Sequence, residues 1–189
     1  MVSTRRRDVI EAAGRLFAEK GYHGTSMRDL GRELGLLGSS LYSHVESKQD
    51  LLVEVVEEGA RLFEDSATAA LDTQGRAIDR LRSLVDGHVD VILDNLDVAR
   101  TFLNEARVLD PDHRARVLEA RDHYEEAFRS VIREGVGDGS FRSDIDPKTT
   151  TILILSMLNA IERWYRADGE LTRDDLVDRI LALTLVGIG

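Results

Sequence analysis

Cysteine is absent from the 189 residues, and proline occurs only twice. Without thiols the chain can form no disulfide, no cysteine-ligated zinc site and no thiolate nucleophile. No stretch of 18 uncharged residues occurs, and the N-terminal MVSTRRRDVI does not lead into a long apolar run. We therefore expect a cytoplasmic protein that is neither secreted nor membrane-spanning.

Catalytic and metal-binding patterns are also missing. The histidines show no i, i+4 pair with a third ligand, and no glycine-rich loop follows a strand pattern. The cluster from Asp110 to His113 could suggest a metal site, but a helix cap with solvated side chains explains it better. We expect no catalytic residue, no metal and no enzyme activity. The histidines are His23, His44, His88, His113 and His123.

Apolar residues instead recur at spacings of three and four along most of the chain, which is typical of amphipathic helices. No strand-type alternation or internal repeat occurs, so we predict an all-α fold of about nine helices. Asp110-Pro111 and Asp146-Pro147 each combine a cap with a first-turn proline and predict helix starts, and Thr172 with Asp175 predicts the cap of a last helix. One helix is expected from residue 76 to about residue 96, and another is expected to end at the glycines 135, 137 and 139.

The stretch from Thr25 to Leu52 combines three helix-start signals with a glycine turn. We expect Thr25 to cap a first helix, which ends at Gly35, and residues 39–44 to form a short second helix. Ser47 with Asp50 forms a capping box that predicts a third helix. Two helices joined by a short glycine-containing turn are typical of a helix-turn-helix, whose second helix enters the DNA major groove.

The same stretch resembles the N-terminal domain of the TetR family of transcriptional regulators. The family pattern is kept in register at Gly35, Leu41, Tyr42, His44, Ser47, Lys48, Leu51 and Leu52. The sequence departs from it at Leu37, where a capping Ser is usual, at Ser39 and Ser40 in place of Gly and Thr, and at Val45 in place of Phe. The resemblance implies a ligand-responsive DNA-binding regulator, most commonly a repressor.

The charge is unevenly distributed. The whole chain carries −10, whereas residues 1–50 hold eight basic and seven acidic residues, a balance of +1, which leaves −11 for the remainder. An acidic bulk behind a head with a basic tip would direct DNA to that tip. From position and chemistry, and from the family's usual contacts, we expect DNA contacts at Arg5, Arg6, Arg7, Thr25, Arg28, Ser39, Ser40, Tyr42, Ser43, His44 and Lys48.

The helix after Pro147 is apolar around most of its circumference, which requires burial on more than one side. We expect the second side to be covered by a partner chain, giving a homodimer through two helices at about 147–167 and 172–187. Paired heads about 34 Å apart would read a palindromic operator. The expected domains are 1–48 for DNA binding and 49–189 for effector binding and dimerisation, with a connector helix at about 47–70.

The resemblance also implies a small-molecule effector whose binding re-orients the two heads, so that their spacing no longer fits the operator. The segment from Asn159 to Tyr165 is similar to a subgroup that senses acyl-coenzyme A thioesters. A lipophilic drug, with an efflux pump as the regulated product, stays open as an alternative, as does a helical enzyme or structural protein without DNA binding. Candidate effector residues are Arg100, Phe102, Leu103, Arg107, Tyr124, Phe128, Leu155, Leu158, Asn159, Arg163 and Trp164.

Overall fold

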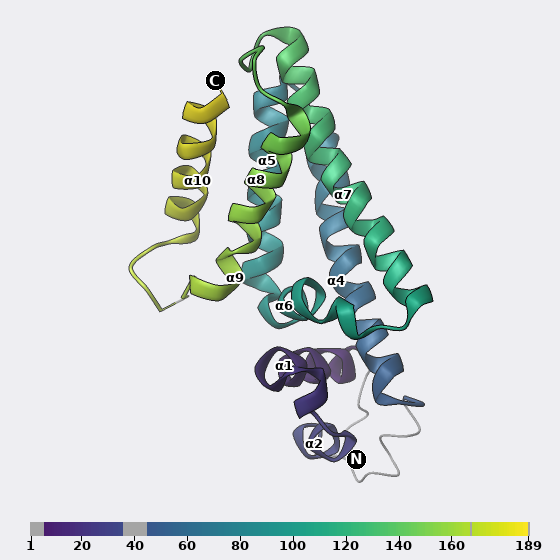
Figure 1. Cartoon of the computed structure of the whole chain (residues 1–189). Helices are drawn as coiled ribbons and strands as arrows, with labels where there is room; N and C mark the ends of the chain where they lie inside the picture. The colour runs from purple at the N-terminus through teal and green to yellow at the C-terminus, as the bar shows by residue number, and fades with distance from the viewer. Residues whose placement is uncertain (1–5, 36–44, 167, 189) are drawn as a thin grey trace. The chain divides into compact units, whose positions relative to one another are not determined.

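The structure is a computed structural model that describes residues 6–35, 45–166 and 168–188. Throughout these residues the regular elements are helical, which confirms the all-α fold class (Figure 1). In chain order they are α1 (Arg6–Gly24), α2 (Met27–Glu33), α4 (Lys48–Leu71), α5 (Ala77–Asp94), α6 (Leu96–Glu105), the 3₁₀ turn η1 (Ala106–Val108), α7 (Pro111–Asp138), α8 (Pro147–Asn159), α9 (Ile161–Trp164) and α10 (Arg173–Ile188). None of the helices so described is long and apolar enough to cross a membrane.

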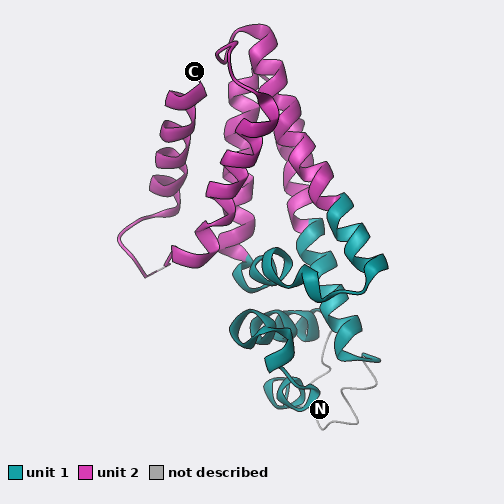
Figure 2. Ribbon diagram, viewed as in Figure 1, with its two compact units in different colours: residues 1–61, 95–119 teal, residues 62–94, 120–189 magenta. Residues whose placement is uncertain are grey.

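Contacts divide the chain into two compact units (Figure 2). Unit 1 comprises residues 1–61 and 95–119, and unit 2 comprises residues 62–94 and 120–189. The boundary falls within α4 and within α7, so each of these long helices contributes residues to both units.

In unit 1 the main packing is between α1 and α6. Gly14 of α1 allows the close approach, because a Cβ at this position would lie 3.3 Å from Cγ2 of Val98 in α6. The buried Thr101 hydroxyl of α6 hydrogen-bonds at 2.8 Å to the carbonyl of Asp97 in its own helix and lies 3.4 Å from the Gly14 carbonyl. A small residue on α1 therefore sets how closely the two helices pack.

Four predicted helix starts are confirmed. Side-chain oxygens accept hydrogen bonds from backbone N–H groups two or three residues further on, at 2.7–3.2 Å. Each bond satisfies a donor that the first helical turn leaves without a backbone partner. The capping residues are Ser47 for α4, Asp110 for α7, Asp146 for α8 and Thr172 for α10.

Two predicted helix ends are close to those in the structure. Helix α5 ends at Asp94, and Leu96 begins α6. Helix α7 continues past Gly135 to Asp138 and ends where Gly139 adopts φ +78. Gly135 is needed for packing, because a Cβ there would overlap the ring of Phe141, whose N–H donates to the Gly135 carbonyl at 2.9 Å.

The helix expected over 147–167 is shorter than predicted. Helix α8 ends at Asn159, and α9 follows from Ile161. The hydrogen-bond pattern changes between them, since the N–H of Arg163 donates to the carbonyl of Ala160, three residues back. This chain buries only one side of α8. Ile154 and Leu158 are buried, whereas Leu153 is 65% exposed.

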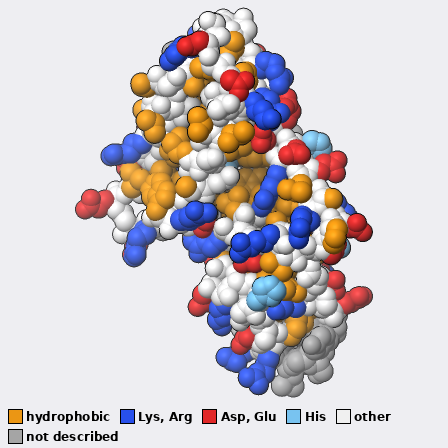
Figure 3. All heavy atoms as spheres, viewed as in Figure 1, with side chains coloured by type: hydrophobic (Ala, Val, Ile, Leu, Met, Phe, Trp, Pro, Cys, Tyr) orange, Lys and Arg blue, Asp and Glu red, His pale blue; other side chains and the backbone are white. Residues whose placement is uncertain are grey.

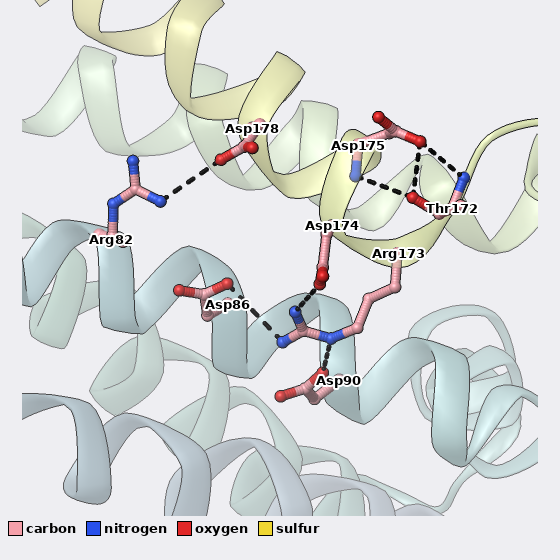
Figure 4. Close-up of polar contacts among 8 residues, drawn as sticks. All are labelled: Arg82, Asp86, Asp90, Thr172, Arg173, Asp174, Asp175 and Asp178. Atoms are coloured by element: carbon pink, nitrogen blue, oxygen red, sulfur yellow. Dashed lines mark hydrogen bonds and ion pairs between the residues drawn. The ribbon is translucent and has the colours of Figure 1, made fainter.

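In unit 2, α5 packs against α8, α9 and α10, and Figure 1 shows α8 running beside α5. Polar contacts also join α5 to α10 (Figure 4). Arg173 at the start of α10 pairs with Asp90 and, at 3.6 Å, with Asp86, both on α5. The hydrogen bond to Asp90 raises the pKa of Arg173, and burial raises the pKa of Asp86. These ion pairs fix the position of α10 on α5.

Candidate DNA-binding and effector-binding sites

The cap of α2 is Ser26, not Thr25 as predicted. The Ser26 hydroxyl accepts the N–H of Asp29 at 3.2 Å, and the Asp29 carboxylate accepts the N–H of Ser26 at 3.0 Å. This is a complete capping box. The hydrogen bond from the Ser26 side chain, and then the one from its backbone N–H, lowers the pKa of Asp29. The capping box fixes the first turn of α2.

Thr25 has a different role, because its side chain is 2% exposed. Its hydroxyl lies 3.1 Å from the carbonyl of Leu16 and 3.0 Å from that of Gly21, so its one proton is shared between two carbonyls of α1. The Thr25 hydroxyl is therefore used inside the protein and is not presented to a phosphate. The neighbouring hydroxyl residue, Ser26, caps α2 in its place.

Lys48 links the start of α4 to the turn between α1 and α2. Its Nζ donates to the carbonyls of Tyr22 and Thr25, both at 2.8 Å, and lies 4.1 Å from the centroid of the Tyr22 ring. The Tyr22 ring in turn contacts Phe17 with centroids 5.8 Å apart. Burial, and then the charge of Asp50, raises the pKa of Tyr22. We call these contacts of Lys48 with Tyr22 and Thr25 the Lys48 anchor.

The other predicted DNA contacts fall into three groups. Arg28 is exposed on α2. Arg6 pairs with Glu54 of α4, and Arg7 pairs with Glu11 at 2.9 Å. Outside the described residues lie Arg5, the unusual Leu37, and the expected recognition-helix contacts Ser39, Ser40, Tyr42, Ser43 and His44. Val45, just after that segment, is buried at 3% exposure.

The predicted effector residues divide between the two units. In unit 1, Phe102 is buried, Arg100 and Leu103 are partly exposed, and Arg107 is exposed. In unit 2, Phe128 and Leu158 are fully buried, Tyr124, Leu155 and Asn159 are partly exposed, and Arg163 and Trp164 are exposed.

A buried polar pair in unit 2 was missed by the sequence reasoning. Nδ1 of His88 on α5 lies 3.0 Å from the hydroxyl of Tyr124 on α7, and His88 is 1% exposed. Burial lowers the pKa of His88 to about 3, so the imidazole is neutral near pH 7. The available signal was its position, because His88 lies on the apolar face of α5 between Val85 and Ile92. We call these two residues the His88–Tyr124 pair.

The cluster at the start of α7 has the predicted capping role. The Asp110 carboxylate accepts backbone N–H groups of Asp112 and His113, and its other oxygen lies 2.6 Å from Nδ1 of His113. Hydrogen bonds from His113 lower the pKa of Asp110. Over the described part of the chain, no three His, Asp or Glu side chains come together in a way that could hold a metal ion.

Two family descriptions match the chain. Residues 9–55 match "Bacterial regulatory proteins, tetR family", and residues 74–188 match "Tetracyclin repressor-like, C-terminal domain". The first covers the segment with the Ser26 capping box and the Lys48 anchor. The second covers the His88–Tyr124 pair.

Relatives match over almost the full length. The HTH-type transcriptional repressor KstR2 of Mycobacterium tuberculosis is 30% identical, over 99% of this chain and 94% of its own. The structure of that ketosteroid transcriptional regulator superposes with a TM-score of 0.92 at 26% identity, covering 100% and 96% of the two chains. The TetR family regulator PfmR of Thermus thermophilus gives 0.87 at 32% identity, covering 94% and 97%. AibR, solved with isovaleryl coenzyme A and operator DNA, gives 0.86 at 24%, covering 95% and 97%, and shares the fold.

The fold and these matches show that the protein is a ligand-responsive DNA-binding transcriptional repressor. The chain belongs to the TetR family. The family and the named relatives are transcriptional regulators rather than enzymes.

Proposed function

We propose that the protein binds a palindromic operator as a homodimer and leaves it when an acyl-coenzyme A thioester binds. Residues 1–48 are proposed to contact DNA, and residues 49–189 to dimerise and hold the effector. Three parts of this proposal depend on different residues, so each can be tested separately.

The dimer is supported by apolar side chains that this chain leaves exposed on α8 and α10. Leu153 is 65% exposed, Leu183 67% and Val186 84%, with Ile152 of α8 at 44%. Figure 3 shows hydrophobic side chains gathered over these two helices. Exposed apolar groups on two helices of one unit are typical of an interface between subunits. In a two-fold dimer, α8 and α10 of both subunits would form a four-helix interface.

Sedimentation equilibrium tests the dimer. We expect a mass of about twice the 21.1 kDa of the chain for the wild type. Leu153→Glu with Val186→Glu should weaken association by about 30-fold or more, because each buries a charge at the centre of the interface. Leu118→Glu is the matched control, since Leu118 on α7 is 52% exposed and lies outside the proposed interface. A monomeric wild type at micromolar concentration would contradict the proposal.

DNA contact is supported by the position of Arg28 on the capped first turn of α2, where a cation and free N–H groups suit a phosphate. Arg5, Arg6, Arg7 and the recognition-helix residues Ser39, Ser40, Tyr42, Ser43 and His44 remain proposed contacts, while Thr25 is proposed to act through the position of α2. An operator can be selected from a random-sequence DNA pool with the wild-type protein. We expect the selected sites to be inverted repeats, and the absence of half-site symmetry would contradict a two-headed dimer.

The acyl-coenzyme A effector is supported by the segment from Asn159 to Tyr165 and by the relatives. KstR2 is named as a ketosteroid regulator, and AibR shows that a protein of this fold accommodates an acyl-coenzyme A and DNA. Arg163 is exposed beside Trp164, where a guanidinium can meet phosphates. In unit 2 the proposed acyl contacts are Tyr124, Phe128, Leu155, Leu158 and Asn159. For unit 1, Phe102 and Leu103 stay the acyl contacts, and Arg100 and Arg107 the phosphate contacts, that the sequence predicts.

A ligand panel tests the effector class. Short-chain, medium-chain and steroid-derived acyl-coenzyme A thioesters are compared with the matching free acids and with lipophilic cations. We expect thioesters to raise the melting temperature and to release the selected operator in a fluorescence anisotropy assay. Release by lipophilic cations, with no response to any thioester, would favour the drug-type effector instead.

A further inference from the structure

We infer that His88 Nε2 donates a hydrogen bond to an acceptor oxygen in the acyl portion of the effector. The inference rests on the proposed function, because it names the part of the thioester that unit 2 recognises. The acceptor is either the thioester carbonyl or a keto or hydroxyl oxygen further along the chain.

The surroundings of His88 are apolar on several sides. The ring of Phe63 lies 5.0 Å from the His88 ring, centroid to centroid, and the Tyr124 ring lies 5.8 Å away. Phe128 continues the aromatic cluster at 5.5 Å from Tyr124. A polar nitrogen at 1% exposure among aromatic rings loses its hydration, so a missing hydrogen bond destabilises the protein. Nε2 of His88 has no such bond to any described residue.

The tautomer follows from the contact with Tyr124. A neutral imidazole has one N–H donor and one acceptor nitrogen. A phenol hydroxyl is a good donor and a weak acceptor, whereas an unprotonated imidazole nitrogen is a good acceptor. Burial raises the pKa of Tyr124, so its hydroxyl keeps its proton. Tyr124 therefore donates to Nδ1 at 3.0 Å, and the imidazole proton is on Nε2. Nε2 is then a buried donor that needs an acceptor oxygen.

Three buried hydroxyls on helices that pack against α5 also lack a hydrogen bond to any described residue, and one of them is Oγ1 of Thr184 on α10. The other two are Oγ of Ser66 on α4 and Oγ1 of Thr151 on α8. Ser66 lies directly against α5, because a Cβ on Gly87, the neighbour of His88, would overlap the Ser66 Oγ. Helix α8, with Thr151, packs on α5. The interior of unit 2 thus holds more hydrogen-bonding capacity than the chain satisfies, which suits a ligand with polar atoms in its apolar part.

The test compares matched ligands on the full-length protein by calorimetry. Octanoyl-coenzyme A and S-octyl-coenzyme A differ only in the thioester carbonyl oxygen, and 5-oxooctanoyl-coenzyme A adds one keto oxygen to the chain. We expect one of two differences in the affinity of the wild type. Either octanoyl-coenzyme A binds about tenfold more tightly than S-octyl-coenzyme A, or 5-oxooctanoyl-coenzyme A binds about tenfold more tightly than octanoyl-coenzyme A. His88→Phe should remove that preference. His123→Phe, at an exposed position on α7, should retain it.

Nitrogen-15 NMR of the histidines gives a readout that a purely packing role would not produce. We expect the ligand-free wild type to carry its proton on Nε2 of His88, and the preferred ligand to shift that resonance. Tyr124→Phe keeps the ring and removes the hydroxyl that donates to Nδ1, so the proton of His88 should no longer be confined to Nε2. Helical circular dichroism should be unchanged in His88→Phe and Tyr124→Phe, which checks the folding of these two variants.

The outcomes are distinct. Equal preferences in the wild type and His88→Phe, or a proton on Nδ1, would overturn the inference while the thioesters still bind and release DNA. If no coenzyme A compound binds the wild type, the proposed effector class itself fails, and this inference fails with it. A preference in the first ligand pair identifies the thioester carbonyl, and one in the second identifies a chain oxygen.

Discussion

Replacing Lys48 by methionine tests whether this residue holds the DNA-binding head together or touches DNA. Methionine keeps the apolar stem and removes the ammonium, so the Lys48 anchor is lost while packing is retained. Hydrogen bonds to a charged group contribute about 1.5–3 kcal/mol each when well buried. The Lys48 side chain is only partly buried and water replaces part of each bond. We therefore expect a loss of about 2 kcal/mol for the two 2.8 Å bonds together.

Two measurements follow from that value. For a chain of 189 residues, about 2 kcal/mol corresponds to a fall of about 4–8 °C in melting temperature, measured by calorimetry. Operator affinity is then measured by fluorescence anisotropy over a range of salt concentrations. If Lys48 acts by positioning Tyr22 and Thr25, Lys48→Met lowers affinity by the same factor at every salt concentration. The slope of log affinity against log salt then stays at the wild-type value.

Arg28→Ala is the matched control, because Arg28 is exposed on α2 and proposed to meet a phosphate. Loss of one phosphate contact reduces the salt slope by about 0.9 for each protomer and leaves the melting temperature near the wild-type value. The anchor reasoning is refuted if Lys48→Met melts like the wild type and shows the reduced slope. In that case Lys48 contacts phosphate, as the sequence predicted.

Three further predictions concern packing and buried polar groups. Gly59→Ala places a Cβ 2.6 Å from Cβ of Phe102 and should cost about 1–3 kcal/mol in urea unfolding. Gly137→Ala, with no atom within 4 Å of the new Cβ, should be neutral or slightly stabilising by the same measurement. Thr25→Val should cost about 1 kcal/mol of thermal stability, because the Leu16 and Gly21 carbonyls lose their buried donor. His88 binds a proton in the unfolded chain near pH 6.5 but in the fold only near pH 3. The neutral state of His88 therefore contributes fully to the free energy of unfolding above pH 6.5. As the pH falls below 6.5 this contribution is lost, by about 1.4 kcal/mol at about pH 5.5. This fall should be absent from the urea unfolding of His88→Phe, and an equal pH dependence in both proteins would contradict the buried neutral state.

The parts of the fold that sequence predicted best depend on short-range chemistry. A capping side chain and the N–H that it accepts are two or three residues apart, so Ser47, Asp110, Asp146 and Thr172 identify helix starts without knowledge of the tertiary structure. The same reasoning assigned the cap of α2 to Thr25, whereas the cap is Ser26. Both are hydroxyl residues next to a helical pattern, and the choice depends on which hydroxyl faces α1.

Helix ends depended more on distant residues. Glycine lowers helix propensity, so three glycines after residue 134 predicted an end. Phe141 lies against Gly135 and requires a residue without a side chain there, and the helix continues to Asp138. The His88–Tyr124 pair was missed for a related reason. Its members are 36 residues apart on different helices, and the periodicity of either helix alone predicts only a buried face.

Polar residues near the DNA-binding segment differ in whether the protein itself uses their hydrogen-bonding groups. Thr25 and Lys48 both make internal hydrogen bonds, whereas Arg28 remains exposed. Loss of affinity on mutation cannot separate the two cases, because a displaced head and a missing phosphate contact both weaken binding. The salt slope separates them, since only a phosphate contact changes the number of counterions released. For Lys48 and Arg28, salt dependence is therefore the measurement that decides their roles.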